Sequence, residues 1–218
     1  VDGMNAEEVA VFTRLAGDKV GATKMDRPED FEPNPVTGKV YVALTNNTNR
    51  GTEGKAAADE ANPRNTNKNG QVLELEDDHA GTSFTWNLLL VCGDPNEADT
   101  YFGGFDKSQV SPISCPDNLA FDSKGNLWVS TDGNALDSND GLFAVVLDGP
   151  RRGETRQFLT VPAGGETCGP IVSDERVVVC VQHPGESDDA TADAPISHWP
   201  DGGDTQPRPS VVAVWKSA

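Results

Sequence analysis

The stretch K24-M-D-R-P-E-D30 holds the residues of this sequence that are best suited to chemistry. Arg27 and Glu29 flank Pro28 in a segment with two positive and three negative side chains. A guanidinium can grip phosphate oxygens or a carboxylate with two parallel N–H donors, and a carboxylate can bind a hard cation. A solvated turn is the other interpretation, because proline is tolerated at a turn or strand entry.

This pattern is repeated in the sequence, and the repeat indicates that its charged side chains occupy equivalent positions in the fold. RPEDFEPNPVTGKVYVALT (27–45) aligns with CPDNLAFDSKGNLWVSTDG (115–133), and ETCGPIVSDERVVVCVQHPG (166–185) is a weaker third copy. Each copy has the pattern of a β-hairpin, with a polar turn between two strands. The alignment sets Glu29 opposite Asp117, each directly after a proline.

In the third copy Glu166 lies near the equivalent position, with its register offset. Carboxylates that converge on one axis repel each other unless a cation neutralises them, so the repeat predicts a metal site. Asn118 and Asn62 would add neutral oxygen ligands. The alternative is that each acidic residue caps its own turn and that no shared site exists.

Three other features are compatible with chemistry but fit simpler roles. Arg27 suits a structural salt bridge as well as a phosphate contact. His183 ends a strand in VQHPG and fits a hydrogen-bonded turn residue. Asp132-Gly133 and the DSND run at 137–140 have the composition of a Ca²⁺ loop without EF-hand spacing. Walker, GxSxG, HExxH and GxGxxG signatures are absent from the sequence.

The elements that must position these residues are mainly strands. Residues 5–20 predict one amphipathic helix, because Val9, Phe12, Ala16 and Val20 recur at spacings of three and four, with Asn5 as N-cap. Eight later segments are rich in β-branched and aromatic residues, and about three shorter strands accompany them. The eight segments are 39–45, 70–76, 82–92, 126–131, 141–147, 155–161, 176–182 and 210–216.

The repeat and the strand count predict β-propeller blades. We expect a mainly β chain, 1–218, with about three blades of six that start near residues 27, 115 and 166. The polar segments 46–69 and 185–209 are predicted loops, the second a surface excursion. About three blades would leave two open sheet edges, so we expect a fragment of a larger propeller that can self-associate through those edges.

The amino-acid composition disfavours several classes of function. With 17 Lys and Arg against 35 Asp and Glu, the net charge of −18 disfavours binding to nucleic acid and to anionic membranes. No apolar run approaches the ~20 residues of a membrane span, and no signal peptide opens the sequence. None of the four cysteines forms a CxxC pair, so we expect small core residues and leave pairing open.

Four collinear motifs resemble the C-terminal part of PhoX-type alkaline phosphatases. They are GATKMDRPEDFE (21–32), NPRN (62–65), CPDNLAFDSKGNLWVSTDG (115–133) and GPIVSDERVVVCVQHPGE (169–186). The resemblance implies a six-bladed β-propeller, periplasmic or secreted and exported by the twin-arginine route. It further implies hydrolysis of phosphate monoesters with iron(III) and calcium ions in the central channel.

Carried over residue by residue, the resemblance makes Arg27 the substrate-binding and catalytic contact to phosphate. Glu29 and Asp117 become metal ligands, with Glu166 and Asn118 as weaker transfers. It also implies a missing N-terminal half of the propeller, so the chain is expected to be incomplete and inactive alone. The alternatives are a non-catalytic calcium-binding or partner-binding propeller module and a propeller hydrolase for lactones or sugars.

Overall fold

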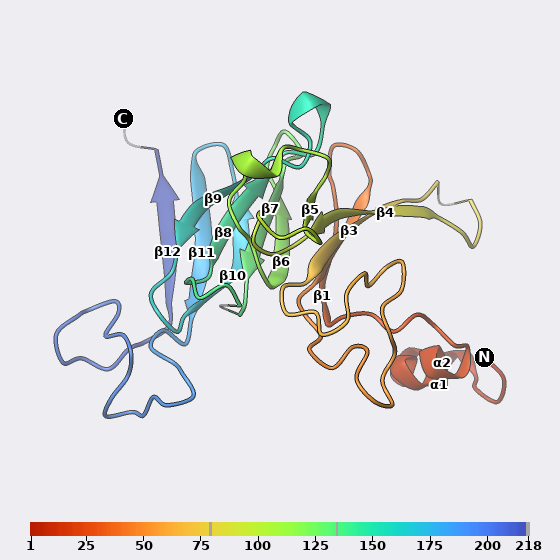
Figure 1. The fold of residues 1–218 in the computed structure, drawn as a ribbon, viewed down its shortest axis with the longest axis horizontal. Helices are drawn as coiled ribbons and strands as arrows, with labels where there is room; N and C mark the ends of the chain where they lie inside the picture. Colours follow the sequence, from red (N-terminus) through yellow and green to blue (C-terminus); the bar gives the residue numbers. More distant parts are fainter. Residues whose placement is uncertain (79, 134, 217–218) are drawn as a thin grey trace.

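The computed structural model describes residues 1–78, 80–133 and 135–216, and it is mainly β (Figure 1). Three antiparallel sheets follow one another along the chain, and two short helices lie at the N-terminal end. In the described part of the chain no helix is long and apolar enough to cross a membrane.

The single helix predicted over 5–20 is wrong: two helices, α1 (Ala6–Val11) and α2 (Thr13–Lys19), take its place. Asn5 caps α1 as expected, in a capping box with Glu8. The helix breaks at Phe12, whose backbone leaves the helical region at φ −107° and ψ 43°. The predicted apolar face is also mostly exposed, since only Ala16 is buried in either helix. The spacing therefore identified an apolar helix face that stays mostly exposed in the described part of the chain.

The strands follow the predicted pattern closely. All eight predicted segments contain a strand, and four further strands bring the described total to twelve. The first sheet contains β1 (Pro28–Pro33), β2 (Val40–Leu44), β3 (Gln71–Glu76), β4 (Thr85–Val91) and β5 (Tyr101–Phe102). The second contains β6 (Pro116–Phe121), β7 (Leu127–Thr131), β8 (Gly141–Val145) and β9 (Thr155–Thr160). The third contains β10 (Glu166–Val172), β11 (Arg176–Gln182) and β12 (Ser210–Trp215).

The three repeats occupy equivalent places in these sheets. Each repeat supplies the first hairpin of its sheet, and strands within every sheet pair in sequence order. Each first hairpin also has an irregular register near its start, between Pro28 and Asp30, between Pro116 and Leu119, and between Cys168 and Ile171. A proline in the first strand interrupts ladder pairing there, because it has no N–H to donate.

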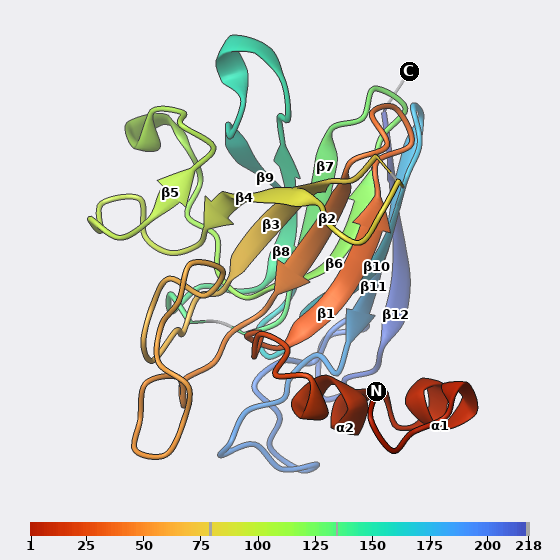
Figure 2. The same cartoon turned by 90° about the vertical axis from the view of Figure 1, so that its right-hand side faces the viewer.

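Apolar clusters join the sheets face to face. The largest cluster combines residues of the first sheet, such as Tyr41 and Leu90, with residues of the second, such as Val129 and Phe143. A second cluster joins Leu142 of β8 to the third sheet. Figures 1 and 2 show the sheets side by side with the first strands β1, β6 and β10 adjacent. The fold therefore brings the starts of three repeats together.

Glu74 ties the first sheet to the second through a buried ionic cluster. Its side chain accepts hydrogen bonds from the Tyr41 hydroxyl at 2.6 Å and from Arg152 Nη1 at 3.0 Å, and Lys39 Nζ lies 3.3 Å away. Burial alone would raise the pKa of Glu74, but hydrogen bonds from Tyr41, Arg152 and Asn87 lower it to about 2. The carboxylate therefore stays charged because its partners replace the lost water.

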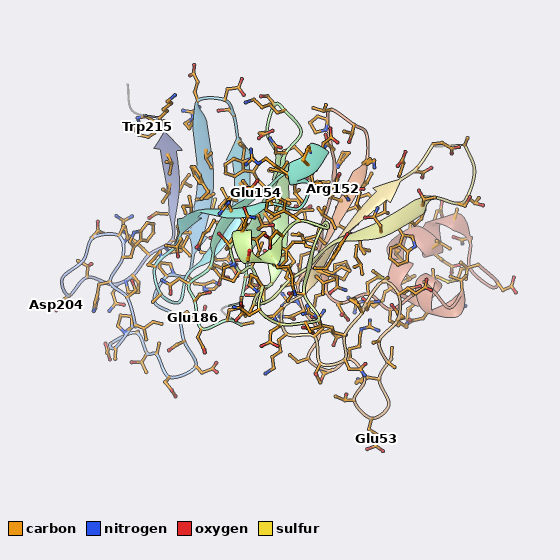
Figure 3. The ribbon with its side chains drawn as sticks, turned by 45° about the horizontal axis from the view of Figure 1, so that its top comes forward. Glu53, Arg152, Glu154, Glu186, Asp204 and Trp215 are labelled. Atoms are coloured by element: carbon orange, nitrogen blue, oxygen red, sulfur yellow. The ribbon has the colours of Figure 1, made fainter. Side chains whose placement is uncertain are left out.

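The two predicted loops behave differently. The segment 185–209 has no strand and extends from the ends of β11 and β12, with Asp204 near its outer end (Figure 3). The segment 46–69 reaches outward to Glu53, yet its base folds over a buried charge (Figure 3). Arg50 of this loop is 1% exposed and Asp26, just before β1, is 0% exposed.

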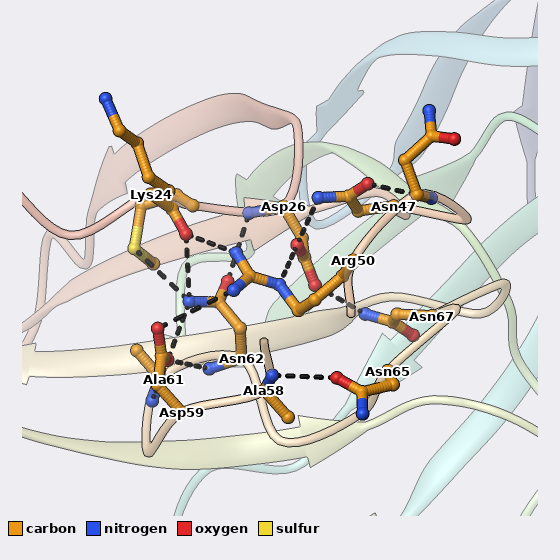
Figure 4. A network of polar contacts seen from close by, with 12 residues as sticks. Lys24, Asp26, Asn47, Arg50, Ala58, Asp59, Ala61, Asn62, Asn65 and Asn67 are labelled. Carbon is orange, nitrogen blue, oxygen red and sulfur yellow. Dashed lines mark hydrogen bonds and ion pairs between the residues drawn. The ribbon is translucent and has the colours of Figure 1, made fainter. Parts of the chain in front are cut away.

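Asp26 and Arg50 form the centre of a polar network that the sequence did not predict (Figure 4). Arg50 Nε donates to Asp26 Oδ1 at 2.6 Å, and Asn47 and Asn67 donate to the two oxygens of the same carboxylate at 2.9 and 3.0 Å. Asn62 Oδ1 accepts from the backbone N–H of Asp26 at 3.0 Å. The network fixes the backbone directly before Arg27 to the 46–69 loop.

Candidate functional site

Arg27 stands at the entry of β1 with its backbone in the left-handed region, at φ +44°. Few non-glycine residues adopt this conformation, and such residues are concentrated at functional sites. The guanidinium donates from Nε to Glu29 Oε1 at 3.1 Å and from Nη2 to Asp132 Oδ2 at 3.4 Å. The Arg27 side chain is 48% exposed, so part of its donor edge remains accessible to an anion.

Asp117 of β6 lies in the same electrostatic environment. Burial raises the pKa of its carboxyl to about 6, with further contributions from the charges of Asp132 and Glu29, while Arg27 opposes the shift. Asp30 adds to this repulsion and also accepts a hydrogen bond from the backbone N–H of Leu119 at 2.7 Å, which joins β1 to β6.

Glu166, at the start of β10, belongs to the same group of carboxylates. Its pKa is raised to about 7, first by burial and then by a hydrogen bond and charge repulsion with Asp132. Its Oε1 accepts from Gln182 and from Cys168 Sγ, the latter at 3.3 Å. Asp132 therefore interacts with both Arg27 from the first repeat and Glu166 from the third.

Asp132 links Arg27 to Glu166, and in the sequence it is marked only by the Ca²⁺-loop composition of Asp132-Gly133. Asp132 directly follows β7, so its position at the end of the second repeat is the sequence feature that could have identified it. Of the DSND run, Asp140 is buried and accepts from Thr131 Oγ1 at 2.6 Å and from Gly133 N at 3.0 Å. Asp140 therefore supports the turn that presents Asp132.

The structure places His183 beside Glu166 and uses the Asn118 side chain to join two strands. His183 has φ +28°, with Nδ1 2.6 Å from Glu186 Oε2 and Nε2 3.7 Å from Glu166 Oε1, so it belongs to the margin of the carboxylate group. The Asn118 Oδ1 atom accepts from the backbone N–H of Gly169 at 2.8 Å, which ties β6 to β10. The side-chain oxygen of Asn62 is used inside the Asp26 network instead.

Comparisons with known proteins show the family of this chain. The family model "Alkaline phosphatase PhoX" covers residues 1–185. The chain belongs to the PhoX family. A solved structure titled "Pseudomonas fluorescens PhoX in complex with vanadate, a transition state analogue" has 34% sequence identity and a TM-score of 0.79. The alignment covers 98% of this chain and 38% of that one, and the comparison with curated proteins gives no match.

PhoX enzymes are metal-dependent phosphatases, so the donor set can be tested against a cation. Glu29, Asp117, Asp132 and Glu166 offer carboxylate oxygens, which hard cations prefer, and their mutual repulsion is what a cation would relieve. Within 1–78, 80–133 and 135–216, no group of three or more His, Cys, Asp or Glu residues is arranged to hold a metal ion. The chemistry of these donors suits a hard cation, but the described residues do not by themselves assemble a metal site.

Proposed function

We propose that this chain is the C-terminal part of a metal-dependent phosphatase that hydrolyses phosphate monoesters, and that its site is incomplete and inactive alone. PhoX family membership supports the phosphatase class. The vanadate that the Pseudomonas fluorescens PhoX binds is a transition-state analogue, which supports the same chemistry here. This chain aligns with 38% of that protein. The six-bladed propeller, with an N-terminal half that supplies further ligands, is part of the proposal.

In this proposal Arg27 binds the phosphate oxygens of the substrate. The accessible guanidinium can form two parallel hydrogen bonds to a phosphoryl group, and these strengthen as charge develops on its oxygens. Its present partners, Glu29 and Asp132, hold the side chain at the entry of β1. A cation bound by these carboxylates would leave the guanidinium free for substrate.

Glu29, Asp117 and Glu166 are the proposed ligands to calcium and iron(III), with Asn118 as a further oxygen donor. Such ions would neutralise phosphate charge and make water a better nucleophile. Asp132 joins this ligand proposal because it interacts with both Arg27 and Glu166. The family's usual secreted or periplasmic location is proposed for this protein too.

The observation that carries this proposal is the contact of Arg27 with carboxylates from two different repeats, in a chain of the PhoX family. The test uses a PhoX protein that contains these residues together with its N-terminal part. Arg27→Ala should lower kcat/KM for p-nitrophenyl phosphate by about 10²–10³ while metal content stays unchanged. Glu29→Gln should instead lower the metal bound per chain, measured by plasma mass spectrometry.

A matched control is Arg208→Ala, because Arg208 pairs with Asp201 in the 185–209 loop, away from the carboxylates. Its kinetics should equal those of the unmodified protein. Unchanged hydrolysis in the Arg27 variant would remove this residue from the site. Full metal retention in the Glu29 variant would remove Glu29 from the ligands.

The alternative is a calcium-binding or partner-binding module without catalysis, which the convergent carboxylates also support. Calcium binding with no hydrolysis of phosphate monoesters or lactones by the longer protein would favour this alternative. A phosphatase activity that depends on Arg27 would exclude it.

A further inference from the structure

Two of the four cysteines lie opposite each other on neighbouring strands of the third sheet. Cys168 of β10 and Cys180 of β11 are direct partners in the antiparallel register, flanked by the pair Thr167 and Val181. Directly opposed residues of antiparallel strands have Cα atoms about 4.5 or 5.5 Å apart, and their side chains leave the same face of the sheet. Disulfides span Cα separations of about 4.4–6.8 Å. The register therefore places the two cysteines at a separation that a disulfide can span, directly before the register irregularity that follows Cys168.

The other two thiols have a different environment. Cys92 and Cys115 are both fully buried, and Cys115 Sγ donates to the carbonyl oxygen of Lys68 at 3.3 Å. Cys180, by contrast, is exposed, and Cys168 is half-buried. A dissolved oxidant can therefore reach Cys180 first, and Cys168 is the cysteine placed directly across the strand from it.

We propose that Cys168 and Cys180 form a cross-strand disulfide when this chain meets a disulfide oxidant such as oxidised glutathione. The Cys180 thiolate attacks one oxidant sulfur, forming a mixed disulfide and releasing one glutathione thiolate. The Cys168 thiolate then attacks the Cys180 sulfur, which forms the intramolecular S–S bond and releases the second. Each cysteine gives up one proton, the protein loses two electrons, and the oxidant becomes two glutathione molecules.

The bond would alter the surroundings of the candidate site as well as join two strands. Reduced Cys168 donates its thiol hydrogen to Glu166 Oε1. Oxidation removes that donor, so the redox state of the pair changes the hydrogen-bond partners of Glu166. The disulfide itself does not depend on the phosphatase proposal.

Tryptic digestion can detect this disulfide, because it places the two cysteines in different peptides. Arg156, Arg176 and Lys216 are tryptic sites that place Cys168 alone in peptide 157–176 and Cys180 alone in peptide 177–216, since Pro209 protects the bond after Arg208. The 218-residue chain is equilibrated with oxidised and reduced glutathione, quenched in acid, alkylated in denaturant and digested. Mass spectrometry should find the two peptides joined by a bond that a reductant cleaves, and alkylation should label two thiols, Cys92 and Cys115.

Two variants control the assignment. Cys168→Ser should accumulate a glutathione adduct on Cys180, because the mixed disulfide has no second thiol to resolve it. Cys180→Ser should give no joined peptides. A stable glutathione adduct on Cys180 in the unmodified chain, four alkylated thiols, or a bond between any other pair would each overturn the proposal.

Discussion

Asp26→Ala should be far more damaging than its place in a charged turn suggests. The carboxylate accepts from Arg50, Asn47 and Asn67, and both Asp26 and Arg50 have essentially no exposed surface. Arg50 also donates to the backbone oxygens of Ala57 and Lys24, so it cannot leave without losing those bonds. The variant therefore keeps a buried guanidinium without its counter-charge.

Breaking a buried pair from one side costs about 3–5 kcal/mol. Domains have a total unfolding free energy of about 5–15 kcal/mol, so this loss is a large fraction of stability. With an m-value of about 2–3 kcal/mol per molar urea, the unfolding midpoint should fall by roughly 1–2.5 M. Tryptophan fluorescence or far-ultraviolet circular dichroism during urea titration measures this midpoint.

Two controls separate the buried charge from other effects. Asp201→Ala removes the exposed partner of Arg208 and should leave the midpoint unchanged. Asp26→Ala combined with Arg50→Met removes both charges and should be more stable than Asp26→Ala alone, because no charge remains buried without a partner. An Asp26 variant no weaker than the Asp201 control, or a double variant weaker than the single one, would refute this reasoning.

Two further predictions concern stability. The pKa of Glu74 is lowered to about 2 from an unfolded value of about 4.3, so its stabilising contribution of about 3 kcal/mol is complete above pH ~4.3 and is lost as the pH falls towards 2. Urea midpoints of Glu74→Gln and the unmodified chain should converge over that range, and a constant difference would contradict the assignment. Gly70→Ala should destabilise the chain by clearly more than Gly54→Ala, because both have positive φ but only the Gly70 Cβ would lie 2.1 Å from a backbone oxygen, that of Thr45. Equal unfolding midpoints for the two variants would show that the close contact costs nothing.

The strand pattern could be predicted because it depends on local residue types. Enrichment in β-branched and aromatic residues located all eight predicted segments, and the repeat located the first hairpin of each sheet. The prediction of a single helix was wrong because the extent of a helix depends on tertiary packing as well as on local residue types. The apolar spacing was real, but whether a helix continues past Phe12 depends on what packs against that face, and only Ala16 is covered among the described residues.

The repeat predicts part of the arrangement of the carboxylates, and their roles as ligands stay predictions. Glu29 and Asp117 follow prolines in aligned repeats, so the repeat alone indicated that they share a position. Asp132 and His183 directly follow second strands, where no proline precedes them. Packing between sheets relates Asp132 to Arg27 and Glu166, and the β10–β11 pairing places His183 near Glu166.

The sequence by itself determined most strands, the repeat and the resemblance to PhoX, since each can be recognised in short stretches of sequence without knowing what packs against them. The tertiary structure decided which charges are buried and which carboxylates meet. Asp26 and Arg27 are neighbours in the same charged heptapeptide, yet one is buried against Arg50 and the other is half-exposed beside Asp132. Burial and charge pairing are set by distant segments, and they control pKa and stability far more than local sequence does.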